Sequence, residues 1–291
     1  MEYLLNIGTM LCIYGILVLS ANLTVGLANL LTMCQAAFYG IGAYFGAFFL
    51  LQMNLPFTLV AMAVMATTGL ISLVVSYASV KLKGDYFILA TLGVQMIVIT
   101  ILTNWTSVTS GPYGIGGIPP IRIMSRWSLD TPLSMFLFSA VVTLLTVLFF
   151  YLLQESPYGR MLRAIRTDDL SVQTLGRDTA FLKASAFFLS AAFASLAGIL
   201  YAAHRSYISP SVFSLDESIF ILTGLFIGGI GSRVRGPLAG ALVIVILPSL
   251  LRFVGLPEEQ AAHLRQVIYG LALVALMFLR PQGIFGDTKL K

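Results

Sequence analysis

The chain has 291 residues, of which 58% are hydrophobic and only 10% are charged, and its mean hydropathy is +0.93. Soluble domains carry about 25% charged residues, so this composition excludes an ordinary soluble fold and predicts an integral membrane protein. The net charge of +5 is then explained by orientation in the membrane rather than by nucleic-acid binding, because the basic residues flank apolar segments.

Nine apolar segments are candidates for membrane-crossing helices, which need about 20 predominantly apolar residues each. The seventh and ninth are short, and the first two could divide differently around residues 22–29, so we expect roughly eight to ten spans. The predicted fold is therefore an all-α, polytopic membrane protein. The segments cover residues 3–21, 30–52, 57–80, 86–104, 133–153, 184–203, 218–231, 237–253 and 267–279.

The basic residues predict the orientation of the chain. If the loop 155–183 is placed in the cytoplasm, most of the 17 Lys and Arg fall on the cytoplasmic side: Lys81, Lys83, Arg160, Arg163, Arg166, Arg177, Lys183, Arg233, Arg235, Arg280, Lys289 and Lys291. The external side then holds Arg122, Arg126, Arg205, Arg252 and Arg265. Because basic residues favour cytoplasmic loops, we expect an external N-terminus and a cytoplasmic C-terminus.

The polar residues do not form a catalytic or metal-binding constellation. Cys12 and Cys34 lie in apolar segments, which predicts that they pack as small hydrophobic side chains. His204 and His263 lie far apart, and no adjacent carboxylate pair has a histidine at a useful spacing. We therefore expect neither an enzyme nor a metal site.

The energy source is predicted to lie on another subunit. The chain carries no phosphate-binding loop of the form G-x-x-x-x-G-K-[ST], so any ATP would be held elsewhere. The spans also carry almost no charged residues, whereas ion-coupled carriers usually need such groups near the midplane. This pattern favours an ATP-driven transport subunit, with an ATP-independent secondary carrier or channel for a small polar solute as the alternative.

The internal loop over residues 155–178 has the most specific local pattern, SPYGRMLRAIRTDDLSVQTLGRD from Ser156 onward. Ser156 followed by Pro157 predicts the start of a helix that runs to about Ile165. Thr167 predicts a second helix start, and Gly176 a position just past its end. The amphipathic pattern alone leaves two interpretations open, a helix lying on the inner leaflet of membrane lipid and a helix that docks on a partner.

The same stretch resembles the cytoplasmic coupling loop of ABC importer permeases, most of all those of the branched-chain amino acid family (LivM/LivH type). In that family the loop inserts into a cleft on the ATPase subunit and transmits its closure. The resemblance assigns ATPase coupling to Gly159, Arg160, Arg163, Ala164, Asp168, Asp169 and Gly176.

Further motifs of that family occur in the same order along the chain. The segments that resemble these motifs are residues 22–44, 82–93, 110–119, 228–236 with Gly240, and 280–283. Two positions depart from the family pattern. This chain has Cys34–Gln35 where the family often has Gly-His, and Gln95–Met96 where the family often has Gly-Glu after T-L-G-x. The departures leave the solute open among branched-chain amino acids, urea, short amides and aromatic acids.

Polar residues inside the apolar segments are candidates for the substrate path, because such groups need a partner or water within a membrane. The alternative interpretation is that they serve helix packing. Two glycine-rich interrupted regions, near residues 22–46 and 224–240, suggest an internal repeat with a binding region between its halves. The path candidates are Asn22, Thr32, Gln35, Thr91 and Gln95.

The resemblance also implies the surroundings of the chain. Residues 1–291 would form a single permease domain in the inner membrane of a bacterial cell and work by alternating access. It would pair with a second, related permease, with a homodimer as the alternative. Two ABC ATPase subunits would hold ATP and Mg, and an extracytoplasmic solute-binding protein would deliver the solute. No cofactor and no nucleic acid would bind to this chain itself.

Overall fold

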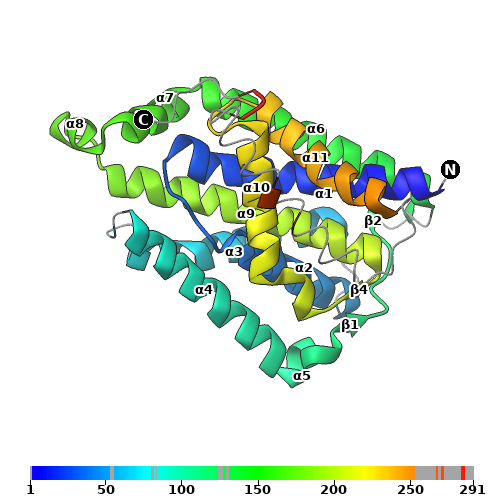
Figure 1. The fold of residues 1–291 in the computed structure, drawn as a ribbon. Coiled ribbons are helices and arrows are strands. Elements are labelled where there is room, and N and C mark those ends of the chain that lie inside the picture. Colours follow the sequence, from blue (N-terminus) through cyan, green and yellow to red (C-terminus); the bar gives the residue numbers. More distant parts are fainter. Residues whose placement is uncertain are drawn as a thin grey trace.

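The computed structural model describes residues 2–52, 56–79, 82, 84–123, 127–128, 131–252, 267, 270–271 and 283–285. These residues form a bundle of long helices, with the shorter helix α10 (Leu215–Gly228) lying across the front in Figure 1. Among the described residues, five helical stretches are long and apolar enough to cross a membrane, as expected for a polytopic membrane protein. They are Glu2–Leu27, Phe57–Ala78, Asp85–Asn104, Pro132–Glu155 and Thr179–Arg205.

Eight of the nine predicted segments form helices. The ninth, 267–279, lies outside the described residues except for positions 267, 270 and 271. Besides α10, the helices are α1 (Glu2–Ala21), α2 (Gln35–Gln52), α3 (Phe57–Ser79), α4 (Asp85–Asn104), α6 (Pro132–Glu155), α9 (Thr179–Arg205) and α11 (Arg235–Arg252).

The prediction was wrong at the start of the second segment. α1 continues into a π-helix, η1 (Asn22–Leu27), and residues 28–34 are not helical, so α2 begins at Gln35 rather than at residue 30. Asn29 adopts a left-handed conformation with φ +55°, which turns the chain, and the N–H of Leu30 donates to the Thr24 carbonyl at 2.9 Å. The turn leads the chain back into the bundle before α2 starts.

The seventh segment also differs from the prediction at its end. α10 stops at Gly228 instead of reaching residue 231. Gly229 and Gly231 have φ values of +117° and +74°, which a right-handed helix does not allow. The glycines therefore end α10 and turn the chain towards α11.

Small residues allow the central helices to approach closely. A Cβ added to Gly42 of α2 would lie 2.3 Å from the Cα of Ser195 in α9, and one added to Gly198 would lie 2.2 Å from the Tyr39 carbonyl. Such backbone contact is typical of helix pairs in membranes, where dispersion forces replace the hydrophobic effect between helices. The ring of Phe38 packs edge-on against that of Phe187 at 5.4 Å, and these contacts show that α2 and α9 run in the same direction.

The bundle contains two long helices that each lead through an irregular stretch into a shorter helix. α1 leads through η1 and residues 28–34 into α2, and α9 leads through β4 (Tyr207–Ile208) and η4 (Pro210–Phe213) into α10. α1 runs parallel to α6, since Thr143 bonds to the Cys12 carbonyl and Phe136 covers Gly8. α9 runs in the opposite direction to α1 and α6 in Figure 1, and its Phe193 contacts Phe150 of α6. The two units therefore run in opposite directions, as an inverted repeat would require, and the repeat itself stays a prediction.

The segment between α4 and α6 covers the end of the bundle opposite to α7. It contains α5 (Thr106–Thr109), η2 (Gly111–Tyr113) and three short strands, β1 (Ile115–Gly116), β2 (Arg122–Ile123) and β3 (Trp127–Ser128). β1 pairs antiparallel with β4, and β2 pairs antiparallel with β3. The β1–β4 pair ties this segment to the stretch that precedes α10.

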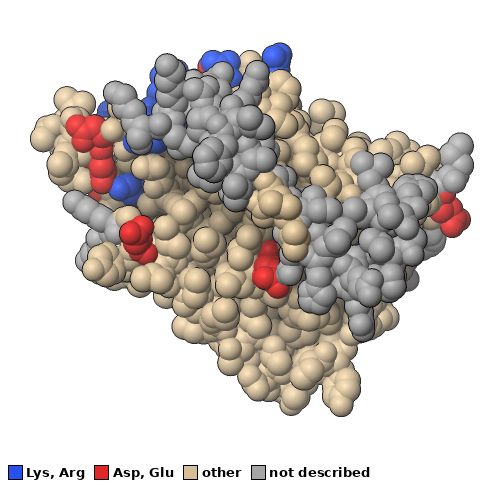
Figure 2. Space-filling view, in the orientation of Figure 1, with Lys and Arg blue, Asp and Glu red and all other residues tan. Residues whose placement is uncertain are grey.

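The surface is mostly uncharged. Figure 2 shows the visible Lys and Arg side chains along the upper and upper-left edge, where α6 ends and α7 begins, and few charges over the rest of this face. Large apolar side chains on α3, α4 and α6 are exposed, as expected for helices that face lipid. They include Met62, Val74, Leu89, Ile97, Leu144 and Leu152.

Candidate functional site

The predicted coupling loop forms two short helices, α7 (Pro157–Thr167) and α8 (Asp169–Thr174), which project from the bundle at the upper left of Figure 1. Ser156 closes α6 and starts α7, because its N–H donates to the carbonyls of Leu152 and Leu153 and its hydroxyl accepts from the N–H of Gly159 at 3.4 Å. The chain therefore folds back at once, without a linker. The predicted helix start at Ser156–Pro157 is confirmed.

The junction between the two helices differs from the prediction by two residues at the end of α7 and by one residue at the N-cap of α8. α7 runs to Thr167 rather than to Ile165, and Asp168 instead of Thr167 is the N-cap of α8. The carboxylate of Asp168 accepts from the N–H of Leu170 at 3.0 Å and from the hydroxyl of Ser171. A carboxylate offers more acceptor sites than a threonine hydroxyl and suits the positive end of a helix. The hydrogen bond from Ser171 holds the pKa of the exposed Asp168 below its usual value.

Three of the seven predicted coupling residues hold α7 against the end of α6. Gly159 is buried, and a Cβ there would lie 2.5 Å from the Leu153 carbonyl. Arg160 donates to the Glu155 carbonyl at 2.8 Å, and Arg163 donates to the Gln154 carbonyl at 2.9 Å. Both arginines thereby satisfy carbonyls at the C-terminal end of α6, where positive charge is favourable.

Asp169 fixes α8 to α9. Its carboxylate lies 2.7 Å from the Nζ of Lys183, and this ion pair is partly exposed. Burial raises the pKa of Asp169, but hydrogen bonds and the charge of Lys183 outweigh it, so the pKa lies below its usual value. Gly176 follows α8 with φ +75°, as predicted for the position just past a helix end.

The outward side of the loop carries exposed apolar groups. Ala164 is exposed, Leu170 is 64% exposed and Leu175 is 80% exposed. Leu162 and Ile165 face the opposite way and are buried. We call Ala164, Asp168, Leu170, Leu175 and Gly176 the loop rim. Exposed apolar groups on a projecting charged loop fit both predicted interpretations, contact with a partner protein and contact with the inner leaflet.

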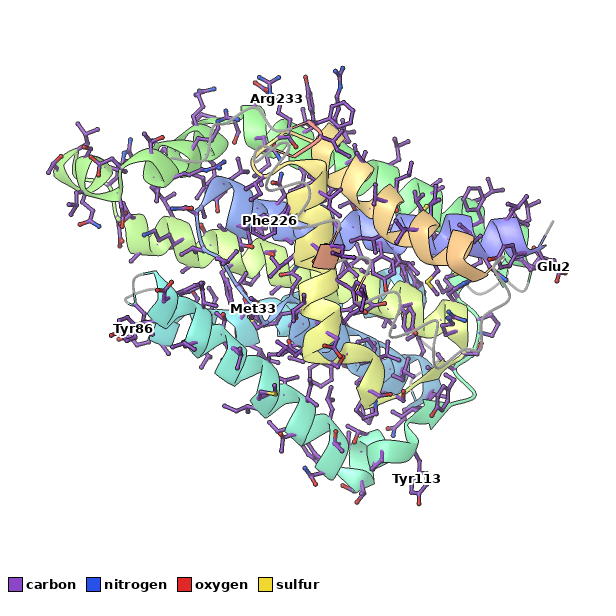
Figure 3. All side chains as sticks on the ribbon, in the orientation of Figure 1. Glu2, Met33, Tyr86, Tyr113, Phe226 and Arg233 are labelled. Carbon is purple, nitrogen blue, oxygen red and sulfur yellow. The ribbon has the colours of Figure 1, made fainter. Side chains whose placement is uncertain are left out.

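The predicted path residues are all buried, and hydrogen bonds tie them to the interrupted segments. The side-chain oxygen of Gln95 accepts from the Ala37 N–H at 2.7 Å and from the Ser218 hydroxyl at 3.3 Å, and its Nε2 donates to the Phe213 carbonyl at 2.8 Å. Gln95 on α4 thus joins the start of α2 to the stretch before α10. In Figure 3, Met33, whose N–H donates to Thr91 of α4, lies below Arg233 and to the right of Tyr86.

Gln35 and Asn22 make similar connections elsewhere in the bundle. Gln35 donates to the Ser20 hydroxyl at 2.7 Å, and the Ser190 hydroxyl donates to the Gln35 side-chain oxygen at 3.4 Å. Asn22 donates to the Ser232 carbonyl at 2.8 Å and accepts from the Gly231 N–H at 3.0 Å. Both amides therefore hold helix ends together.

The two predicted threonines bond to the non-helical segment before α2. Thr91 donates to the Ile88 carbonyl and accepts from the N–H of Met33 at 3.1 Å, while Thr32 bonds locally with Cys34. In this conformation each of the five path candidates has a protein partner, which fits the packing alternative. Their role in a solute path stays a prediction.

Comparison with known proteins gives the family. The family model described as the branched-chain amino acid transport system permease component matches residues 3–277. This chain belongs to that family. The LivM permease protein of Salmonella typhimurium is 32% identical over 98% of this chain and 70% of its own length, and that of Escherichia coli K12 is 31% identical over the same shares. The E. coli K12 LivH permease protein is 23% identical over 100% of this chain and 97% of its own length.

No solved structure matches this permease. As the permease component of an ABC transporter family, it is a multi-pass membrane protein and is not itself an ATPase. The described residues contain no group of three or more His, Cys, Asp or Glu side chains that could hold a metal ion.

Three residues of the permease that connect helix breaks were missed by the sequence analysis: Arg166, Ser190 and Ser218. Arg166 donates to the Gly26 carbonyl at 2.7 Å, and Ser218 accepts from the Ala36 N–H at 2.9 Å. Arg166 lies four residues after the buried Leu162, so helical spacing alone places its charge on the buried side of α7. That position was the signal that could have identified it. The serines gave no comparable signal.

Proposed function

We propose that this permease is the membrane-spanning subunit through which an ABC importer moves a branched-chain amino acid into the cell. The whole chain would act as one permease domain with residues 155–178 as its coupling loop. The named LivM and LivH relatives, which are called high-affinity branched-chain amino acid permeases, support this choice of solute.

The observation that carries the proposal is the geometry of the coupling loop. α7 is fixed to α6 through Ser156, Gly159, Arg160 and Arg163, so a force on the loop reaches a membrane-spanning helix without a flexible linker. The loop rim stays free to contact a partner. An ATPase subunit that grips the rim would therefore move α6 and α7 together.

The partners follow from this geometry and from the relatives. Two ATPase subunits would bind ATP and Mg and close on the coupling loops of two permeases. E. coli K12 has both a LivM and a LivH relative, which supports a heterodimer of two related permeases. A solute-binding protein would dock over the segment between α4 and α6, on the opposite end of the bundle.

The orientation and the path complete the proposal. The protein would lie in the cell membrane, with α7 and α8 in the cytoplasm and the N-terminus outside, because the basic residues of the loop favour the cytoplasmic side. Gln35 and Gln95 would line the path in a conformation where α2 and α10 separate. Their amides would then exchange backbone partners for solute or water.

The test is purification of the tagged permease, coexpressed with its partner subunits, from detergent-solubilised membranes. ATP hydrolysis of the eluate and uptake of radiolabelled leucine into liposomes are measured. Ala164→Trp enlarges the exposed loop rim, while Ala66→Trp makes the same change on an exposed position of α3. Gly159 is unsuitable for this purpose because any side chain there would clash within the permease itself.

We expect an ATPase to co-purify with the native chain and with Ala66→Trp, and to be lost or strongly reduced with Ala164→Trp. ATP-dependent leucine uptake should follow the same order. A permease that purifies alone and carries leucine across liposomes without ATP would contradict the proposal and favour a secondary carrier or channel. Competition by urea would test the solute assignment separately.

A further inference from the structure

Arg166 connects the coupling loop to the end of a membrane-spanning helix. It lies in the last turn of α7, and its Nη1 donates to the carbonyl of Gly26 in η1 at 2.7 Å, across 140 positions of sequence. η1 continues α1 without interruption, so this bond joins α7 to the end of a 26-residue helical stretch. Within the part of the chain that the structure describes, the side chains of Arg160 and Arg163 donate to the end of α6, from which α7 itself emerges.

The ends of α1 and α10 meet at the same point. Asn22 of η1 accepts from the N–H of Gly231 at 3.0 Å and donates to the carbonyl of Ser232 at 2.8 Å, in the turn that follows α10. Gly26 packs directly on this turn, since a Cβ there would lie 2.8 Å from the Gly231 nitrogen. We call Asn22, Gly26, Gly231 and Ser232 the helix-end junction.

The guanidinium of Arg166 occupies space that Gly231 leaves open. A Cβ on Gly231 would lie 2.0 Å from the Nη1 of Arg166 and 3.1 Å from the Gly26 carbonyl. Gly231 also has φ +74°, a conformation that favours glycine. Arg166 therefore touches both sides of the helix-end junction, one through a hydrogen bond and the other through direct packing.

The chemistry of this contact favours a strong bond. The Gly26 carbonyl lies in the last turn of η1, where carbonyls lack helical partners and the helix dipole attracts positive charge. Burial lowers the pKa of Arg166 from its usual value, which reflects partial removal of the charge from water. Arg166 takes part in neither of the two ion pairs found among the described residues, Lys183–Asp169 and Arg233–Glu155.

The element that Arg166 holds is itself suited to rearrangement. A π-helix has hydrogen bonds of a wider turn than an α-helix, is rare, and often occurs at functional positions. On the other side of the helix-end junction, Gly229 and Gly231 end α10, and the N–H groups of Ile284 and Phe285 donate to the carbonyls of Ile227 and Gly228. The helix-end junction therefore lies between a π-helix and a glycine turn, and neither of these is a regular α-helix.

We propose that Arg166 is a positioning residue that transmits movement of α7 to the joined ends of α1 and α10, and so controls the cytoplasmic end of the solute path. This inference rests on the proposed function, in which an ATPase subunit moves the coupling loop. When α7 shifts, the guanidinium pulls on Gly26 and presses on Gly231. Lysine would not replace it fully, because a single ammonium lacks the planar fork that fills this space.

The test compares Arg166→Met with Arg233→Met in the complete complex, reconstituted into liposomes with its ATPase subunits. Arg233 is an exposed residue at the same end of the bundle whose side chain pairs with Glu155, so its removal makes the same charge change. Phosphate release and radiolabelled leucine uptake are measured together, and their ratio gives leucine carried per ATP hydrolysed.

We expect Arg166→Met to retain the ATPase subunits and most of the hydrolysis, while leucine carried per ATP falls on the order of tenfold, a common size for coupling between sites. The leucine carried per ATP by Arg166→Lys should lie between the values of Arg166→Met and of the native chain. If Arg166→Met fails to accumulate, Arg166→Lys alone is compared with the native chain. Arg233→Met should keep the native ratio.

Two outcomes would overturn the inference. One is native hydrolysis and native uptake in both Arg166 variants. The other is a parallel loss of hydrolysis and uptake at the native ratio, which would indicate only a structural or docking role. Failure of the proposed function is distinguishable, because then the native chain itself would bind no ATPase and show no ATP-dependent uptake.

Discussion

Gln95 of α4 donates a 2.8 Å hydrogen bond to the carbonyl of Phe213, which lies 118 positions later in the sequence. The same amide accepts from the N–H of Ala37 at 2.7 Å. One side chain thereby satisfies one backbone group at each of the two interruptions in the bundle, at the start of α2 and in the stretch before α10. Because unpaired backbone groups are costly inside a membrane, this arrangement makes such interruptions possible.

Replacement of Gln95 by Met should therefore destabilise the permease. Met has a similar length but leaves the Ala37 N–H and the Phe213 carbonyl without their partner, at a cost of about 1–3 kcal/mol for each buried group. Thermal unfolding of the purified permease in detergent measures the loss. Gln52→Met is the matched control, since Gln52 is exposed at the end of α2. Equal stability of the two variants would contradict this role.

Two glycines provide a paired test of helix packing. Gly42→Ala should destabilise the bundle by about 1–3 kcal/mol or more, because the new Cβ would lie 2.3 Å from the backbone of Ser195. Gly93 in α4 has no atom within 4 Å of an added Cβ, so Gly93→Ala should be neutral or stabilise the helix by up to about 1 kcal/mol. Yield and thermal unfolding in detergent measure both, and the reverse order would refute the packing argument.

The helices were predictable from the sequence, whereas the interruptions were only partly so. Apolar length marks a span because the bilayer has a fixed thickness, and eight segments were located on that basis. The position where α2 starts depends on Gln95 and Ser218, which reach Ala36 and Ala37 from distant parts of the chain. No local pattern contains that information.

In the coupling loop, too, the sequence predicted the local helix start but not the tertiary contacts. The start of α7 follows from Ser156 and Pro157, whose local chemistry defines a helix N-terminus. Gly159 was predicted as a partner contact but is buried against α6, because α7 follows α6 without a linker. That fold-back is a tertiary feature, so the sequence could indicate the loop but not which side of it faces outward.

The ion pair between Asp169 and Lys183 predicts a pH-dependent attachment of α8. Because the pKa of Asp169 is lowered in the folded protein, its contribution is complete above the ordinary aspartate pKa of about 3.9 and is lost as the pH falls through the lower folded value. Asp169→Asn should remove this stabilising contribution at neutral pH, which lowers the free energy of unfolding by about 0.2–1 kcal/mol for a partly exposed ion pair.

A spin label on exposed Thr174 measures the mobility of α8 in these variants. We expect increased mobility for Asp169→Asn at pH 7 and for the native chain only in strong acid. Glu155→Gln removes a different exposed ion pair, with Arg233, and should leave the signal of α8 unchanged. Identical mobility of all three proteins at pH 7 would exclude an anchoring role for Asp169.

Two tyrosines give opposite predictions for the removal of a hydroxyl group. Tyr39 is fully buried among the rings of Tyr201 and Phe213, and its hydroxyl has no hydrogen-bond partner among the described residues. Tyr158 of α7 bonds through its hydroxyl to that of Ser185 at 2.8 Å. Tyr158→Phe should therefore cost about 0.5–1.5 kcal/mol, whereas Tyr39→Phe should be neutral or stabilising, because it removes a buried polar group that lacks a partner. Thermal unfolding of both variants in detergent compares them directly, and a larger loss for Tyr39→Phe than for Tyr158→Phe would contradict this prediction.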